Sequence, residues 1–318
     1  MKVAASLERA EEGPTEKVWL YAKLVLTAIF WGGTFVAGRS IAGQIDPFAA
    51  AFLRFAIASC FLGAFVWRSY GEIPKLTKHD FVLVFLLGLT GVFTYNVLFF
   101  SGLKTVAAGR ASLIIASNPA FIALFSCWLL RERLGITKAL GIVLSMGGAV
   151  VVISRGNPLA LLHGGAGWGE LYIFGCVLSW VLYSLIGKFA MNRLTPLAAV
   201  TYSCIIGAAC LLLPASMQGL WQQLAGYSLA VWVGILYLGF FGSALGFFWY
   251  YQGIRELGAS QAGVFINLVP VSAILLAHLV LQEALDGSLL IGACLVIAGV
   301  YYTNRPGRRP SMTETEPG

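Results

Sequence analysis

The chain has 318 residues, of which 58% are hydrophobic and 11% are charged, and its mean hydropathy is +0.82. Soluble domains carry roughly 25% charged residues, so this composition excludes a soluble globular protein and indicates an integral membrane protein. The formal net charge is +7, but the basic residues are spread over short loops rather than gathered on one face. We therefore expect no nucleic-acid partner.

The six cysteines all lie inside apolar runs and form no CxxC pair, so the sequence predicts neither a disulfide framework nor a metal site, and no cofactor is expected. Residues 1–17 are charged and predict a cytoplasmic tail. The first apolar run is too long for the core of a signal peptide, so we expect it to be retained as a membrane span.

A hydrocarbon core of about 30 Å needs roughly 20 apolar residues in a helix, and the chain lacks the alternating pattern of a barrel. The sequence therefore predicts an all-α membrane protein with about ten transmembrane helices. Their expected ranges are 18–41, 48–67, 81–103, 106–130, 136–153, 169–190, 197–217, 230–253, 259–281 and 289–303. The tail 304–318 is polar and predicts disorder.

The stretch from Ala107 to Leu134 returns later in the chain, beginning at Gly258. Pro119 and Glu132 of the first copy correspond to Pro270 and Glu283 of the second. The earlier spans repeat as well, with Trp31, Gly38 and Arg39 matched by Trp180, Gly187 and Lys188. The sequence thus predicts two repeats of five spans, residues 18–153 and 169–303, joined by an external linker at 154–168.

Five spans per repeat is an odd number, so the second repeat enters the membrane from the opposite side and the repeats are inverted. Positively charged residues concentrate on the cytoplasmic side of membrane proteins. If both termini are cytoplasmic, the external segments hold only Arg39, Lys104, Arg110 and Arg155, and most other basic residues lie inside. We therefore predict cytoplasmic termini.

Inverted repeats allow two states of similar energy, open to opposite sides around a site at the repeat interface. This is the logic of alternating access, so the architecture favours a transporter of a small molecule. One chain supplies both halves of such a site. A monomer in the lipid bilayer is therefore sufficient, and a dimer stays open.

The sequence resembles the EamA-type branch of the drug/metabolite transporter superfamily over nearly its whole length, about residues 19–303. The resemblance rests on FWGGTFVAGR in the first span, DPFAAAFLRF in the second, ALFSCWLLRERL at the end of the fourth and its echo AHLVLQEAL. It implies the ten-span inverted fold and similarity to exporters of amino acids and related metabolites. It constrains the substrate far less.

Aromatic and amide side chains gather at comparable depth in several spans, away from the interfaces where tryptophan usually anchors. A site with aromatic walls and a few amides suits a zwitterion with an apolar side chain. Ordinary helix packing is the alternative for each residue. The candidate substrate-binding residues are Trp31, Tyr95, Asn96, Asn118, Trp180, Tyr183, Trp249 and Asn267.

Arg54 is the only formal charge well inside a span, and its guanidinium needs partners there. One hypothesis makes it a clamp for a substrate carboxylate, and the other has it bond to carbonyls or a neighbouring polar group. Pro119 and Pro270 each remove a backbone donor and free the carbonyl four residues earlier. Their matching positions favour a gating role over a purely structural one.

No aspartate or glutamate lies at the centre of any expected span, which disfavours the acid-coupled exchange of small multidrug antiporters. An intramembrane hydrolase would need Ser243 and His278 in contact, but their expected depths differ by roughly 13 Å, so we expect no enzyme. The prediction is an inner (plasma) membrane exporter of aromatic or neutral amino acids. Export of drugs or cationic compounds is the alternative, and transport of phosphorylated metabolites is less favoured because only one basic residue is embedded.

Overall fold

The computed structural model describes residues 14–71, 75–130, 135–159 and 167–304. All regular elements in these segments are helices, in agreement with the all-α prediction. Residues 1–13 and 305–318 of the two tails, residues 160–166 of the linker and Glu132 lie outside the described segments.

The first repeat contains five helical passes. The first, second and fifth are single helices, and the third and fourth are interrupted. In chain order they are α2 (Pro14–Ile41), α3 (Pro47–Tyr70), the joined elements α4 (Lys78–Leu87), η1 (Gly88–Thr94) and α5 (Tyr95–Leu103), the pair α6 (Ala108–Ala116) and α7 (Asn118–Leu130), and α8 (Ile136–Ile153). The helix α2 begins four residues before the expected start of the first span, because Pro14 can open a helix where no N–H is required.

The second repeat has five passes in the same order, with two short helices added between its second and third passes. They are α10 (Trp168–Ala190), α11 (Pro196–Met217), the short α12 (Leu220–Gln223) and η2 (Leu224–Gly226), the joined α13 (Leu229–Leu236), η3 (Tyr237–Leu245) and α14 (Gly246–Leu257), the pair α15 (Ala259–Ile266) and α16 (Leu268–Leu281), and α17 (Gly287–Asn304). Within the described segments, nine helices are long and apolar enough to cross a membrane, and Gly287–Thr303 is a shorter apolar helix.

The second helix of each repeat begins with the same chemistry. Asp46 accepts hydrogen bonds from the backbone N–H groups of Phe48 and Ala49, and Thr195 accepts one from Ala198. A proline follows each capping residue at the first helical position, where its missing N–H costs nothing. The second helices of the two repeats therefore begin in the same way.

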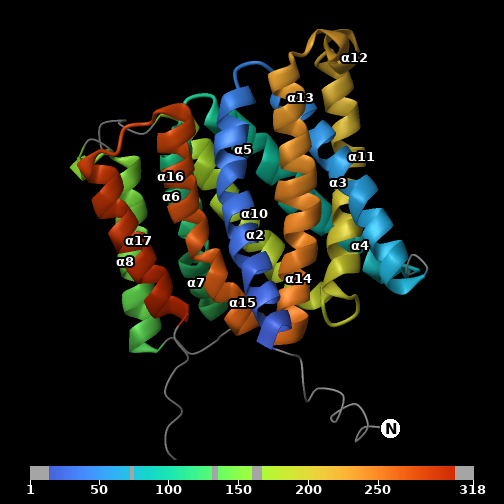
Figure 1. Ribbon diagram of the computed structural model, residues 1–318. Coiled ribbons are helices and arrows are strands. Elements are labelled where there is room, and N and C mark those ends of the chain that lie inside the picture. Colours follow the sequence, from blue (N-terminus) through green and yellow to red (C-terminus); the bar gives the residue numbers. More distant parts are fainter. Residues whose placement is uncertain (1–13, 72–74, 131–134, 160–166, 305–318) are drawn as a thin grey trace, which may run out of the picture.

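The start of α2 and the end of α17 lie at the same face of the molecule, and α12 lies at the opposite face (Figure 1). We call these the terminal face and the distal face. The chain thus crosses the molecule an even number of times, and equivalent helices of the two repeats run in opposite directions. This is the arrangement expected of inverted repeats.

Much of the packing joins one repeat to the other: α2 packs on α16, α3 on α11, α5 on α10, and α8 on α17. The α8–α17 contact is the most extensive of these. A Cβ at Gly148 would lie 2.8 Å from the backbone nitrogen of Val296, and a Cβ at Gly299 would lie 2.7 Å from the carbonyl oxygen of Gly141. Small residues therefore let these backbones approach closely, as is common between membrane helices.

Candidate substrate site

Two π-helical segments, η1 and η3, interrupt the third pass of each repeat at equivalent positions. Their glycines are covered by side chains of the first pass of the other repeat: Tyr183 on α10 lies against Gly91, and Thr34 on α2 lies against Gly242. Gly88 and Gly246 lie in equally close contacts, against the backbone of α11 and against Trp31. π-Helical segments are rare and are frequent at functional sites.

Arg54 on α3 lies between the two π-segments. Its Nε donates to Ser243 Oγ at 3.0 Å, and its Nη1 donates to Asn96 Oδ1 at 3.0 Å. Asn96 follows η1 in the first repeat, and Ser243 lies within η3 of the second. The side chain is 8% exposed, so a buried guanidinium links the two repeats.

The two partners of Arg54 are themselves fixed by the π-segments. The Asn96 Nδ2 group donates to the carbonyl oxygens of Val92 at 2.9 Å and Gly91 at 3.3 Å. Ser243 Oγ donates to the carbonyl oxygen of Leu238, five residues earlier, at 3.0 Å. Each side chain thus satisfies π-helical carbonyl oxygens and presents an oxygen to Arg54.

Trp180 is the centre of one aromatic cluster. Its ring lies 5.5 Å from that of Tyr95 and 5.0 Å from that of Tyr183, and Tyr95 also stacks on Phe99 at 6.0 Å. All three predicted residues of this cluster are half-buried. The structure therefore brings Tyr95, Trp180 and Tyr183 together at the interface of α5 and α10.

Trp31 is the centre of the equivalent cluster. Its ring lies 5.7 Å from Phe247 and 5.2 Å from Tyr250, and a Cβ at Gly246 would meet its Nε1 at 2.7 Å. Trp249 is instead stacked on Phe30 at 5.9 Å, in the seam between α2 and α14.

The fourth pass of each repeat is broken near its middle. The helix α6 ends at Ala116 and α7 begins at Asn118, while α15 ends at Ile266 and α16 begins at Leu268. Pro119 and Pro270 follow the breaks, as their lack of an N–H group requires. Asn118 Oδ1 is fully buried without a hydrogen-bond partner, and Asn267 is half-buried.

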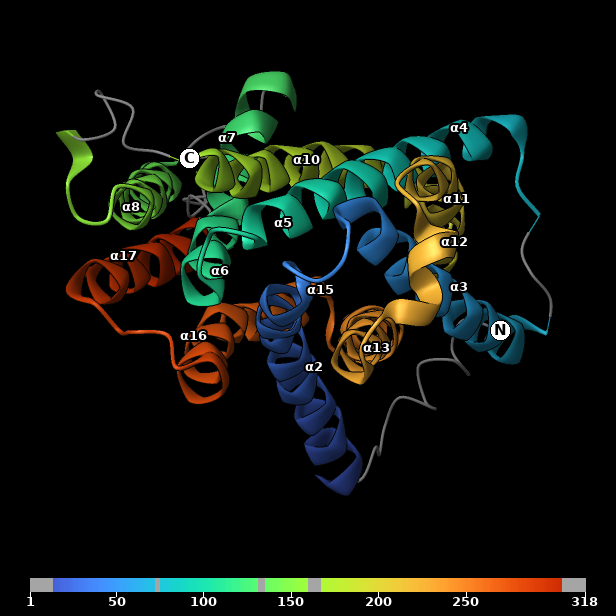
Figure 2. The same cartoon turned by 90° about the horizontal axis from the view of Figure 1, so that it is seen from above.

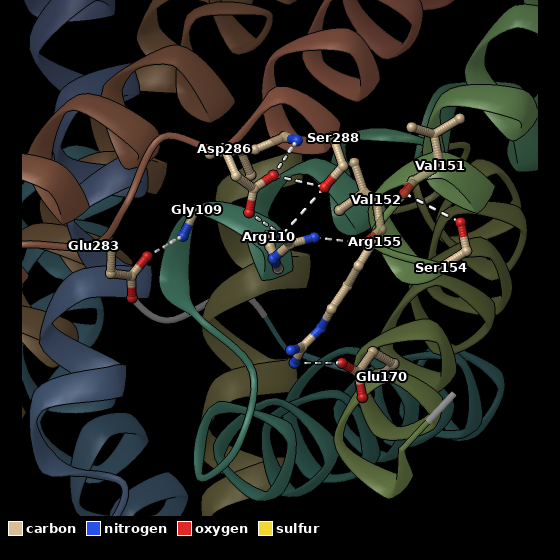
Figure 3. A network of polar contacts seen from close by, with 11 residues as sticks. Gly109, Arg110, Val151, Val152, Ser154, Arg155, Glu170, Glu283, Asp286 and Ser288 are labelled. Carbon is tan, nitrogen blue, oxygen red and sulfur yellow. Dashed lines mark hydrogen bonds and ion pairs between the residues drawn. The ribbon is translucent and has the colours of Figure 1, made fainter. Parts of the chain in front are cut away.

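At the distal face, Glu283 joins the repeats across these broken helices. Its carboxylate accepts hydrogen bonds from the backbone N–H groups of Ala108 at 2.7 Å and Gly109 at 3.0 Å, at the start of α6 (Figure 3). A negative charge at a helix N-terminus is favourable because it meets unpaired N–H groups and the positive end of the dipole. Gln282 takes a left-handed conformation (φ 55°) directly before it.

A second contact lies beside it. Arg110 forms an ion pair with Asp286 and donates to Ser288 Oγ at 3.2 Å and to the carbonyl oxygen of Val152 at 2.9 Å (Figure 3). The Ser288 hydroxyl, the Leu289 N–H and Arg110 all favour the ionised carboxyl, so they lower the pKa of Asp286 against the opposing effect of burial. These contacts tie α6 and α8 to the start of α17.

Two depressions open at this face. One of about 260 Å³ is lined by Arg39, Arg110, Arg155, Glu283 and Asp286 among others. Another of about 610 Å³ is lined by residues that include Gln44, Lys104, Leu281 and Glu283. Glu283 therefore lines both depressions.

The two ends of the broken helices are not equally packed. The distal elements α6 and α16 lie side by side, whereas α7 and α15 are not among the closely packed pairs of the described segments. In the view from above, α7 and α15 lead away from the contact between α6 and α16 in different directions (Figure 2). The repeats are thus in contact through α6 and α16 toward the distal face, whereas α7 and α15 are not packed closely on each other.

The model of the EamA-like transporter family matches residues 18–154 and 167–305, once for each repeat. The chain belongs to the EamA-like transporter family. It is similar, at 31% identity over 93% of this chain and 97% of the relative, to the uncharacterized transporter YyaM of Bacillus subtilis. The multi-pass membrane fold and the transporter class follow from this membership.

Other relatives of this EamA-like chain carry more specific names. It is 29% identical, over 93% of its length and 96% of the relative, to a probable terminal-alkyne amino-acid exporter of Streptantibioticus cattleyicolor. One solved structure has a TM-score of 0.59 and 23% identity, covering 88% of this chain and 94% of that one, which supports the fold.

Sequence analysis of this EamA-like chain missed the partner of Arg54. Ser243 entered only as half of a hydrolase pair with His278, yet it bonds Arg54, while His278 Nδ1 bonds the carbonyl oxygen of Glu283 at 2.9 Å. Phe247 and Tyr250 beside Trp31 were also missed. The aromatic run around Trp249 was the available signal, but the π-segment before it changes which of its residues face α2.

Proposed function

We propose that the protein exports aromatic or neutral amino acids and related small metabolites across the inner (plasma) membrane by alternating access. The observation that carries the proposal is the pair of aromatic clusters, around Trp31 and around Trp180, one on the first helix of each repeat. Such surfaces bind an apolar side chain through ring contacts. The name of the amino-acid exporter relative points to the same substrate class.

The distribution of basic residues supports cytoplasmic termini, which makes the distal face external. In that orientation α6, α16 and Glu283 join the two repeats at the external side, which supports a state closed to the outside. This is the state in which an exporter takes up its substrate. The breaks at Ser117 and Asn267 are the proposed gating points, with Pro119 and Pro270 keeping the half-helices separate.

The test is uptake of labelled tryptophan, phenylalanine, methionine and threonine into proteoliposomes, with and without a pH gradient. We expect saturable uptake down the substrate gradient that does not depend on pH. Trp31→Ala and Trp180→Ala should each raise the half-saturating concentration roughly tenfold, from the loss of about 1 to 2 kcal/mol of ring contact. Trp221→Ala, whose side chain is exposed and bonded to Ser216, is the matched control.

Transport of a lipophilic cation without transport of any amino acid would contradict the proposal and favour the alternative of drug export. Uptake that requires a pH gradient would contradict the facilitated mechanism while leaving the substrate class intact.

A further inference from the structure

The guanidinium of Arg54 is only partly used by the protein. Nε and Nη1 are hydrogen-bonded, whereas Nη2 donates to no described residue. The polar side-chain atoms that are fully covered and unpartnered belong to Ser59, Asn118, Ser145 and Tyr227, and Arg54 is not among them. Nη2 is therefore an unpartnered but reachable donor on a side chain that is more than nine-tenths buried.

No carboxylate of the described segments balances this charge. The ion pairs found there join Arg110 to Asp286, Arg155 to Glu170, Arg193 to Asp80 and Arg255 to Glu256. The partners of Arg54 are the neutral side chains of Ser243 and Asn96 and the ring of Phe55, whose centroid lies 5.1 Å from the guanidinium carbon. A buried charge with only neutral partners is costly, and such a charge within a membrane span marks a functional site by default.

The guanidinium is also fixed in direction. Asn96 and Ser243 hold two of its nitrogens from opposite repeats, and both are themselves held by π-helical carbonyl oxygens. A donor group positioned by a second set of hydrogen bonds needs little reorganisation to receive a ligand. Ser243 Oγ and Asn96 Oδ1 are neutral, so they position Arg54 but leave its positive charge without a counter-ion.

The free end of Arg54 belongs to the same region as the aromatic cluster. Asn96, which accepts a hydrogen bond from Arg54, directly follows Tyr95 in the chain, and the Tyr95 ring contacts the Trp180 ring. An anionic group at Nη2 would thus be attached to a molecule whose apolar part can reach Trp180 and Tyr183.

We propose that Arg54 Nη2 is a carboxylate subsite that receives the free carboxylate of the substrate, with Asn96 and Ser243 as the positioning residues. This inference rests on the proposed function and narrows it: substrates must carry a carboxylate, and amines of the same shape are not transported. Charge-assisted hydrogen bonds from arginine to a carboxylate supply the selectivity. The subsite joins the repeats, so the ligand contacts both halves of the protein.

The first test measures binding rather than transport. The thermal unfolding midpoint of the purified full chain in nanodiscs is recorded with phenylalanine, 3-phenylpropionate and phenethylamine at equal concentrations. Phenylalanine and 3-phenylpropionate should raise the midpoint, and phenethylamine should not. Arg54→Gln should weaken the binding of both carboxylates roughly 10- to 100-fold, Arg54→Lys should weaken it less, and Arg255→Gln, with a side chain 78% exposed, should leave it unchanged.

Asn96→Asp is a more specific test of the subsite, because it places a carboxylate of nearly the same size as the amide against Arg54 Nη1. This built-in anion should compete with the ligand and abolish stabilisation by 3-phenylpropionate. The variant also loses the Asn96 Nδ2 bonds to the carbonyl oxygens of Val92 and Gly91, so its own unfolding midpoint without ligand is the reference. Equal stabilisation by phenethylamine and phenylalanine, or unchanged carboxylate binding in Arg54→Lys and Asn96→Asp, would overturn the subsite. Carboxylate binding that depends on Arg54 in a protein that transports no amino acid would retain the subsite and reject the proposed function alone.

Discussion

The distal and terminal ends of the broken helices are built from equivalent sequence but have different surroundings. Leu113 and Ile114 on the distal α6 are fully buried. Val264 on α15, the repeat equivalent of Leu113, is 61% exposed. The difference shows that equivalent residues of the two repeats are packed differently: α6 is buried against α16, whereas part of α15 is exposed. An exchange of the two arrangements would give the state open to the other side.

The largest effect is expected from locking the closed end. A Cβ at Gly109 would lie 3.7 Å from the Cα of Ile274, which is within reach of a disulfide between α6 and α16. Gly109→Cys with Ile274→Cys, in a background without the native cysteines, should lose nearly all transport on oxidation and regain it with a reductant. The pair Ala123→Cys and Gly263→Cys on α7 and α15 should cross-link poorly. Full transport by the oxidised first pair would show that the distal end does not open.

Removal of the Glu283 carboxylate should weaken the contact between the two repeats at the distal end. Glu283→Ala loses the two bonds to the start of α6, a change worth roughly 1 to 2 kcal/mol. A cysteine at the buried position of Ser112 should then react roughly tenfold faster with an impermeant maleimide added at the distal side. Glu256→Gln at the other end is the control, and equal labelling in both variants would argue against Glu283 as a closure.

The α8–α17 pair is the fixed reference for this comparison, since it packs more extensively than any other helix pair. Gly299→Ala should destabilise the protein by about 1 to 3 kcal/mol, because its Cβ would meet the backbone of Ser145 and Gly141. Gly147→Ala on the same pair meets nothing within 4 Å and should be neutral or slightly stabilising. Chemical unfolding measures both, and equal stabilities would contradict close packing as the cause.

The smallest effect concerns Asp286, whose side chain is 46% exposed. Its folded-state pKa lies below the ordinary value of 3.8, owing first to the Ser288 hydroxyl and further to the Leu289 N–H and Arg110. Its contribution is therefore fully present above that ordinary value and is lost as the pH falls through the lowered pKa. Asp286→Asn should cost less than about 1 kcal/mol at pH 7. A stability difference that persists at pH 2 would show that the carboxylate charge is not the cause.

The fold could be predicted because each membrane pass consists of consecutive, mostly apolar residues. Pro119 and Pro270 indicated that the fourth pass of each repeat is interrupted. Trp180 with Tyr95 and Tyr183 could be proposed from depth alone, since all three lie near mid-span.

The lateral contacts of the site could not be predicted in the same way. A π-segment shifts the facing of every later residue in its helix, so helical periodicity could not place Ser243 against Arg54 or separate Trp249 from Tyr250. Nor could the sequence show which end is closed, because equivalent residues such as Glu132 and Glu283 are equally suited to cap a helix. That choice depends on the relative free energy of two arrangements of the same contacts.

The two π-segments also carry information on ancestry. Well under 1% of residues in proteins are π-helical, so two independent origins at equivalent positions are improbable. The single five-helix ancestor therefore already contained the segment before its gene was duplicated. Arg54 has no counterpart, because Ser203 occupies its place in the second repeat. The π-segments are thus older than the difference between Arg54 and Ser203. A single arginine bonds Ser243 within one segment and Asn96 beside the other.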